Sequence, residues 1–187
     1  MTESQKATRA TIKIGSLEVE GFMLPDGSYR MSQAQVAECI GDDAIYARRF
    51  LKSRALKALQ GGGYTPDTFE VEPTDQVRGQ TRIQGWPLDI VYTYWVYRCS
   101  RGNKQSFSLV IALGSESLER RFDNAFGVQR SEEEYNTLLA NRVQQLEQQA
   151  GEAFAAADDE RRNADRLEQQ LREAGIVPYW EKKADDD

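Results

Sequence analysis

The stretch Gly41-Asp42-Asp43-Ala44-Ile45-Tyr46-Ala47-Arg48-Arg49-Phe50-Leu51-Lys52 carries the clearest structural pattern in the chain. It follows a short amphipathic run, residues 32–40, for which Ser32 is a suitable N-cap residue. Gly41 then marks the end of that run, because glycine readily adopts the left-handed conformation that closes a helix. The sequence therefore predicts a helix, a turn and a second helix.

The second helix of this pair has two distinct faces. If residues 44–52 are helical, the 3.6-residue period places Arg48, Arg49 and Lys52 on one arc of roughly 100°. The opposite arc is apolar and consists of Ala47, Phe50 and Leu51. We expect the apolar arc to pack and the cationic arc to be available to phosphate groups. Ser53 is expected to start a further helical turn over residues 54–60.

The charge of the chain is unevenly distributed. The formal net charge of the 187 residues is −6. Residues 1–130 carry 17 Lys and Arg against 15 Asp and Glu, net +2, whereas residues 131–187 carry 7 against 15, net −8. Residues 44–66 contain five cations and no acid. A polyanionic partner is therefore compatible with the first part of the chain despite its acidic total.

The absence of histidine excludes several enzyme designs. Histidine is the usual general base at neutral pH, a frequent metal ligand and a member of most nucleophilic triads, and the chain has none. The two cysteines, Cys39 and Cys99, lie in apolar surroundings typical of small buried thiols rather than of a disulfide framework. No spacing of acids matches a calcium loop or a catalytic carboxylate pair. The sequence predicts no cofactor and no metal site.

Strand signals flank the helix pair on both sides. Residues 11–24 alternate and are followed by the turn Pro25-Asp26-Gly27 and by residues 28–31, which predicts a short β-hairpin. Residues 68–72 and 80–83 predict a second hairpin. Residues 1–10 are polar and are expected to be disordered. The predicted class is α+β, with a globular domain over residues 11–130.

Two longer helices are predicted to supply much of the core of this domain. Pro87 suits the start of the first. The second is expected over about residues 104–126, before Gly127, with an apolar face at three- and four-residue spacing. The residues of that face are Phe107, Val110, Ile111, Gly114, Leu118, Phe122 and Ala125.

Residues 131–175 predict a long coiled-coil helix that begins with a capping box at Ser131 and Glu134. Apolar residues fall on the a and d positions of one heptad frame. Gly175 closes the helix, and residues 176–187 form an acidic tail. We expect homo-oligomerisation, most simply a dimer, through the seam residues Leu139, Val143, Leu146, Leu167 and Leu171.

The cations of the first domain are assigned roles by their positions. Arg49 and Gln33 are candidates to read base edges, and the candidates to hold phosphates are Arg48, Lys52, Arg54 and Lys57. The basic corner at residues 98–104 has two interpretations. Arg101 and Lys104 either make a second phosphate contact or belong to an ordinary helix terminus whose cations complement the helix dipole.

Several of these motifs carry a resemblance to known families. A hairpin with Asp26-Gly27-Ser28-Tyr29-Arg30-Met31-Ser32, the helix pair, a second strand pair and two helices around residues 101–104 resemble the N-terminal modules of phage antirepressors, the KilA-N and Bro-N group. Residues 17–146 are also similar to an uncharacterised cyanobacterial family through that motif, residues 101–105 and residues 118–123. The first resemblance implies an α+β domain that binds DNA or a regulator; the second implies no activity.

The sequence thus predicts a non-enzymatic, DNA-binding regulator that acts as an oligomer on double-stranded DNA. The alternative is a protein-interaction or adaptor module whose acidic coiled coil captures a protein partner. No apolar run is long enough to span a bilayer, and residues 1–10 lack a signal-peptide core. A cytoplasmic protein without membrane contact is therefore expected.

Overall fold

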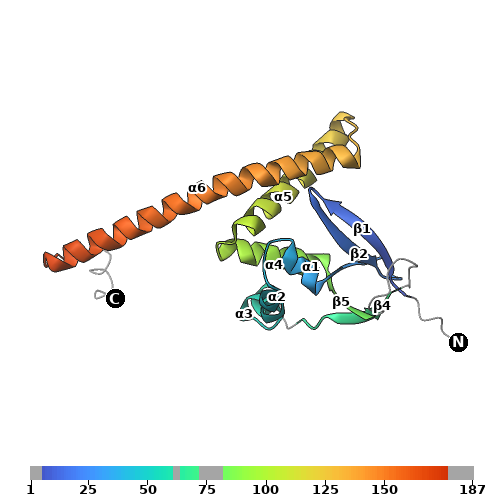
Figure 1. Ribbon diagram of the computed structural model, residues 1–187, viewed down its shortest axis with the longest axis horizontal. Helices are drawn as coiled ribbons and strands as arrows, with labels where there is room; N and C mark the ends of the chain where they lie inside the picture. Colours follow the sequence, from blue (N-terminus) through green and yellow to red (C-terminus); the bar gives the residue numbers. More distant parts are fainter. Residues whose placement is uncertain (1–5, 61–63, 72–81, 177–187) are drawn as a thin grey trace. The chain divides into compact units, whose positions relative to one another are not determined.

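The computed structural model describes residues 6–60, 64–71 and 82–176, and it divides into two units, residues 1–147 and residues 148–187. The first unit contains one antiparallel five-stranded sheet and most of the helices (Figure 1). The strands are β1 Thr8–Ile14, β2 Leu17–Met23, β3 Tyr29–Ser32, β4 Asp67–Glu70 and β5 Arg82–Pro87. The helices are α1 Gln33–Glu38, α2 Ala44–Leu51, α3 Arg54–Gln60, α4 Leu88–Ser100, α5 Lys104–Phe126 and α6 Glu132–Glu173.

The α+β class is confirmed, but the two predicted hairpins form a single sheet in the order β1-β2-β3-β5-β4. Residues 11–24 do not form one strand. They belong to β1 and β2, which reverse direction at Gly15, where φ is +63°. The predicted turn at Pro25-Asp26-Gly27 joins β2 to β3, and pairing of β3 with β5 unites the two hairpins. Because β3 and β5 are far apart in the sequence, no local sequence pattern indicates that they pair.

The folded part begins earlier than residue 11. β1 starts at Thr8, and the Ala7 N–H donates to the carbonyl of Glu70 at 2.9 Å. Ala7 is buried with Phe22 and Val71 in a small second cluster. The expected disorder of residues 1–10 is therefore wrong for residues 7–10, because a short apolar side chain at position 7 closes this cluster. Residues 1–5 lie outside the described residues, as do residues 177–187 of the predicted acidic tail.

The predicted helix boundaries rest on local hydrogen bonds. Ser32 caps α1 by accepting from the Gln35 N–H, and Ser53 accepts from the Leu56 N–H at 3.2 Å at the start of α3. Gly41, with φ +63°, ends the turn after α1. The capping box of α6 is confirmed, since Ser131 N–H donates to Glu134 at 2.7 Å and the Glu134 N–H donates back to Ser131 Oγ at 3.2 Å.

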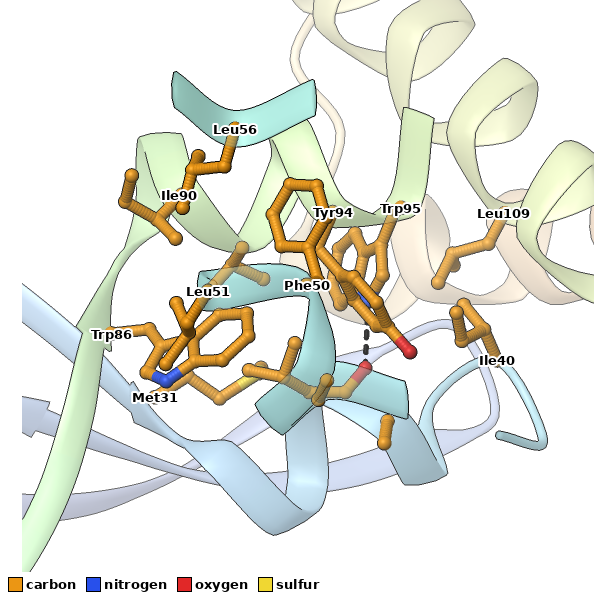
Figure 2. Packing of buried hydrophobic residues seen from close by; sticks show 14 of the residues in the cluster. Met31, Ile40, Phe50, Leu51, Leu56, Trp86, Ile90, Tyr94, Trp95 and Leu109 are labelled. Carbon is orange, nitrogen blue, oxygen red and sulfur yellow. Dashed lines mark hydrogen bonds between the residues drawn. The ribbon is translucent and has the colours of Figure 1, made fainter. Parts of the chain in front are cut away.

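The main core lies between the sheet and the helices of the first unit (Figure 2). Trp86 from β5 and Tyr94 from α4 meet edge to face, with ring centroids 5.8 Å apart. Phe50 from α2 lies 5.2 Å from the Tyr94 ring. The indole N–H of Trp95 donates to the buried carbonyl of Val36 at 2.8 Å, which ties α4 to α1. The short helices α1 and α2 are therefore held by aromatic side chains of β5 and α4.

The apolar face predicted for α5 meets the core only in part, since Val110 packs against it but the later residues of the face do not. Its buried residues are Ser106, Ser108, Leu109, Ala112 and Asp123. Ile111, Leu118 and Phe122, which were expected to be buried, are exposed. The prediction was wrong because the spacing identifies an apolar face but not which face of the helix is covered, and small side chains at 106, 108 and 112 fit against the rest of the unit.

The first turns of α6 belong to the first unit. Leu139 is only 2% exposed, and Val143 packs against the main core. The Gly15 N–H of the β1–β2 turn donates to Asn136 Oδ1 at 2.9 Å. Leu139 is therefore covered by its own chain and Val143 is partly covered, while the oligomerisation seam itself stays a prediction. Leu146 is half-buried in the same unit.

The second unit contains the rest of α6, residues 148–173. Of the predicted seam residues it holds Leu167, which is 57% exposed, and Leu171, which is half-buried. Gly175 closes the helix with φ +72°, as predicted. A coiled coil requires a partner helix, so this assignment stays a prediction.

Substitution of Leu139 tests whether the start of α6 is part of the core. We expect Leu139→Ala to lower the free energy of unfolding by about 3 kcal/mol, because it leaves a cavity at a buried site. Leu167→Ala, the same change at an exposed position of the same helix, is expected to cost less than about 0.5 kcal/mol. Urea denaturation followed by circular dichroism measures both. Equal losses in the free energy of unfolding for the two variants would contradict the assignment of the start of α6 to the core.

Candidate nucleic-acid interface

The cations predicted on α2 and α3 are exposed. Arg48 and Arg49 lie on α2 and Lys52 follows its last residue; Arg54 and Lys57 lie on α3. Neither helix contains an acid. Within residues 6–60, 64–71 and 82–176, none of the five forms an ion pair with a carboxylate. The five charges therefore face solvent without internal neutralisation.

The buried side of the same helices fixes this orientation. Ala47, Phe50 and Leu51 of α2 are all buried in the main core, as the predicted arcs require. Leu56 of α3 is fully buried as well. Because α2 and α3 are separate helices that meet at Ser53, Arg54 and Lys57 stay outside the core. The predicted break in the helix is confirmed.

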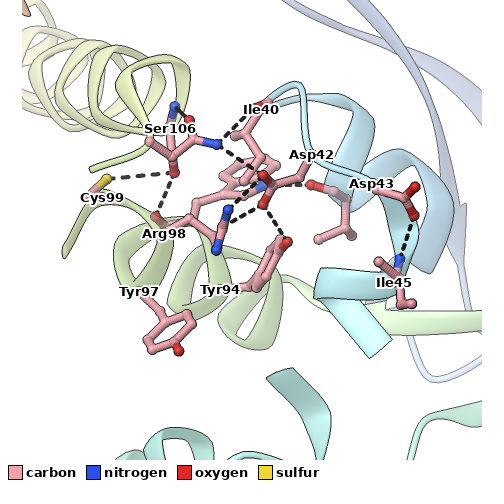
Figure 3. Close-up of polar contacts among 12 residues, drawn as sticks. Ile40, Asp42, Asp43, Ile45, Tyr94, Tyr97, Arg98, Cys99 and Ser106 are labelled. Atoms are coloured by element: carbon pink, nitrogen blue, oxygen red, sulfur yellow. Dashed lines mark hydrogen bonds and ion pairs between the residues drawn. The ribbon is translucent and has the colours of Figure 1, made fainter. Parts of the chain in front are cut away.

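A carboxylate in the turn before α2 holds this part of the molecule together (Figure 3). The side chain of Asp42 is largely buried. Tyr94 donates to Asp42 Oδ2 at 2.7 Å, and Arg98 Nη2 donates to Oδ1 at 2.9 Å. Asn103 Nδ2 also donates to Oδ1, at 3.1 Å. A single acid thus receives hydrogen bonds from both ends of the α4–α5 connection.

Asn103 ties the basic corner to the same turn. Its Oδ1 caps α5 by accepting from the Ser106 N–H at 2.8 Å, while its Nδ2 donates to the carbonyl of Ile40 at 3.1 Å. Gly102, with φ +80°, makes the reversal between α4 and α5. The corner at residues 101–104 is therefore fixed against the turn between α1 and α2.

Aromatic contacts bring the corner beside α2. The guanidinium of Arg101 lies 5.5 Å from the centroid of the Tyr97 ring. Tyr97 in turn lies 5.0 Å from Phe50 of α2. Arg98 lies over the Tyr46 ring at 4.8 Å. Arg101 is thus linked through Tyr97 to Phe50 of α2, although it lies some fifty residues further along the chain, and Lys104 is exposed at the same corner.

Gln33 is placed apart from this group. It is the first residue of α1, at the opposite end of that helix from the turn that leads to α2. Its side chain is half-buried, and no contact joins it to the cations among the residues that the structure describes. Of the eight predicted site residues, five lie on or directly after the neighbouring helices α2 and α3, Arg101 and Lys104 lie at the corner between α4 and α5, and Gln33 begins α1.

The sequence analysis did not identify the residues that position the site. Asp42, Tyr94, Arg98 and Asn103 interact over separations of up to 61 residues. Only one local signal was present. Asp42 is an acid directly after the turn glycine, next to a stretch that is otherwise cationic.

Burial changes the acidity of several groups near the site. It raises the pKa of the Tyr94 hydroxyl, and the hydrogen bond that this hydroxyl donates to Asp42 raises it further. Burial also raises the pKa of the Cys39 thiol to about 11. At neutral pH Cys39 is therefore a thiol rather than the thiolate that nucleophilic chemistry needs.

Comparison with known proteins adds no further constraint: no family model, curated protein or solved structure matches the chain. Across the described part of the chain, no three histidine, cysteine, aspartate or glutamate side chains converge as metal ligands would. None of the described helices combines the length and apolar character needed to cross a membrane.

Replacement of Asp42 tests its role in holding the turn. We expect Asp42→Ala to lower the free energy of unfolding by about 3 kcal/mol, because Arg98, Tyr94 and Asn103 would all lose their shared acceptor. Asp43→Ala is the matched control. Asp43 accepts only the Ile45 N–H at the start of α2, and loss of such a cap costs about 1 kcal/mol. Urea denaturation compares the two variants, and equal costs would argue against the network.

The raised pKa of Tyr94 predicts loss of stability in alkali. Below about pH 10 the hydroxyl keeps its proton in both states; above it, the unfolded chain releases a proton that the folded chain retains. The free energy of unfolding should then fall by up to about 1.4 kcal/mol per pH unit for this group. Tyr94→Phe should show a slope shallower by that amount in urea titrations across this range. The pKa values of Tyr64 and Tyr135 are also raised, but both residues are present in the wild type and in Tyr94→Phe. Their contributions to the slope therefore cancel when the two proteins are compared.

Proposed function

We propose that the chain is a non-enzymatic regulator that binds double-stranded DNA through α2, α3 and the corner between α4 and α5. One observation carries the proposal: five exposed cations lie on or directly after two helices without acids, and none is paired with a carboxylate of the described residues. Ordinary surface helices mix both signs of charge, so a one-sign surface on a net acidic protein favours a polyanionic ligand.

In this proposal α1 and α2 act as a helix-turn-helix unit. The second helix of such a unit enters the major groove, and α2 presents its cations opposite a buried apolar face. Arg49 is proposed to reach base edges. Arg48, Lys52, Arg54 and Lys57 are proposed to hold phosphates, with Arg101 and Lys104 as a further contact. Gln33 is a weaker candidate for base contact because it lies at the far end of α1.

The proposed binding is electrostatic and therefore sensitive to salt. Each neutralised phosphate releases counterions and contributes about 0.9 to the slope of log affinity against log salt. Five contacts would reduce the affinity about 500-fold between about 50 and 200 mM salt. Binding as a dimer in the cytoplasm would double the number of contacts and suit a site with two halves.

The alternative function is that of an adaptor that captures a protein partner through α6. The observation in its favour is that residues 152–167 of α6 are exposed almost throughout and rich in acids. An adaptor of this kind would show no duplex affinity near physiological salt, but would form a defined complex with its partner.

Neutralisation of the cationic face tests DNA binding. We expect Arg48→Ala with Arg49→Ala to weaken binding to a random duplex at least 10-fold at low salt and to reduce the salt slope by about 1 to 2. Fluorescence anisotropy over a salt series, with duplex and single-stranded DNA, measures both quantities.

The control removes two charges elsewhere. Arg161→Ala with Arg166→Ala changes the net charge equally, at exposed positions on α6. It should leave the affinity nearly unchanged. DNA binding by the wild type that survives the Arg48 and Arg49 substitutions would exclude the proposed surface, and absence of binding by the wild type would exclude the function.

A further inference from the structure

An unpartnered apolar stripe runs along α5. Phe122 is 63% exposed and Phe126 is 77% exposed, and the two rings are stacked with centroids 6.4 Å apart. Leu118 and Ile111 continue the stripe towards the start of the helix, and both are exposed. Their spacings of four, four and seven residues place all four side chains on one side of α5.

The stripe faces away from the elements that pack on α5 within the first unit. Arg120 forms a bidentate ion pair with the carboxylate of Glu132, with distances of 2.7 and 2.8 Å. The hydroxyl of Tyr135 donates to the carboxylate of Asp123 at 2.8 Å. These contacts join α5 to the start of α6. By the 3.6-residue period, position 120 lies on the opposite side of the α5 helix from Leu118 and Phe122, and position 123 lies about 100° to 140° from them. Within the described residues of the first unit, the stripe is therefore left exposed.

The exposed area matches what a stable dimer requires. At about 200 Å² per phenylalanine side chain, Phe122 and Phe126 expose roughly 280 Å² between them. Ile111 and Leu118 bring the patch to roughly 450 Å², within the range of about 300–600 Å² for the largest apolar patch of a monomer, a patch that is often functional. An interface of standard size buries about 800 Å² on each partner, of which a little more than half is apolar. The stripe thus supplies about the apolar part of one such interface.

We propose that this stripe binds the same stripe of a second copy, with the two α5 helices antiparallel. A two-fold axis requires a self-complementary surface. With the axis at the level of Ser115 and Leu118, the small residues Gly114 and Ser115 allow close approach, and Phe122 of one copy meets Ile111 of the other. The two Arg121 side chains, exposed beside the stripe, then lie apart on either side of the axis.

This interface is independent of DNA binding and differs from the α6 seam that the sequence predicts. Three of its residues, Ile111, Leu118 and Phe122, belong to the apolar face that we expected in the core, whereas Phe126 was not part of that prediction. A face at regular spacing that no element of its own chain covers is typical of helix-to-helix association. The cations of α2 and α3 take no part in this dimer interface.

Two matched substitutions in the full-length chain distinguish the two surfaces. Sedimentation velocity over a range of protein concentrations should show a dimer for the wild type. Phe122→Glu should weaken dimerisation about 100-fold or more, because each dimer loses two central contacts. Leu167→Glu introduces the same charge at an exposed position of α6 and should leave the dimer intact. The circular dichroism spectrum of Phe122→Glu should match the wild type, and its melting temperature should match that of the wild type at a concentration where the wild type is monomeric, because dimerisation itself raises the melting temperature. Phe126→Glu serves if they do not.

Three results would overturn the proposal: a wild-type chain that is monomeric at every concentration, a Phe122→Glu or Phe126→Glu variant that folds and still dimerises, or a dimer disrupted only by Leu167→Glu. The orientation has its own readout. A tagged Ile111→Cys chain mixed with an untagged Phe122→Cys chain should form mixed disulfides on oxidation, which parallel helices would not allow.

Discussion

The carboxylate of Asp42 is the point on which the arrangement of the first unit depends. It lies in the turn between α1 and α2 and accepts hydrogen bonds from Tyr94, Arg98 and Asn103. A largely buried charge is stable only where hydrogen-bond partners surround it. The turn, the end of α4 and the start of α5 must therefore all be in place for Asp42 to be buried. The same acid neutralises Arg98. The cations further along α2 have no equivalent partner among the described residues, and their charge stays available.

Charge and burial are separated along the short helices. On α2, Phe50 and Leu51 pack against the aromatic residues of β5 and α4, while the side chains of Arg48 and Arg49 are exposed and form no ion pair within the described residues. The apolar side therefore determines the position of the helix and leaves the cationic side exposed. Residues 131–187 hold half of the acids of the chain, 15 of 30, but only 7 of its 24 cations, so the overall charge says little about the character of this face.

The sequence predicted a structural feature correctly wherever the residues that determine the feature are close together in the chain. The two faces of α2, the caps at Ser32 and Ser53 and the capping box at Ser131 all follow from residues within one or two turns of each other. The single sheet and the Asp42 network could not be found in this way, because their partners are tens of residues apart. Ile111 and Leu118 show a different limit. Their spacing correctly marks an apolar face, but only the structure shows that these two residues are exposed. In the same way, only the structure shows that Leu139 is buried.

The helices that carry the cations are very short: α1 has six residues, α2 eight and α3 seven. Helices of this length do not persist alone in water, because nucleation is costly and few bonds repay it. A peptide excised from residues 32–60 would keep every charge yet lose the geometry that aligns them. The arrangement of these cations therefore depends on the sheet and on the aromatic residues of β5 and α4 against which the short helices pack.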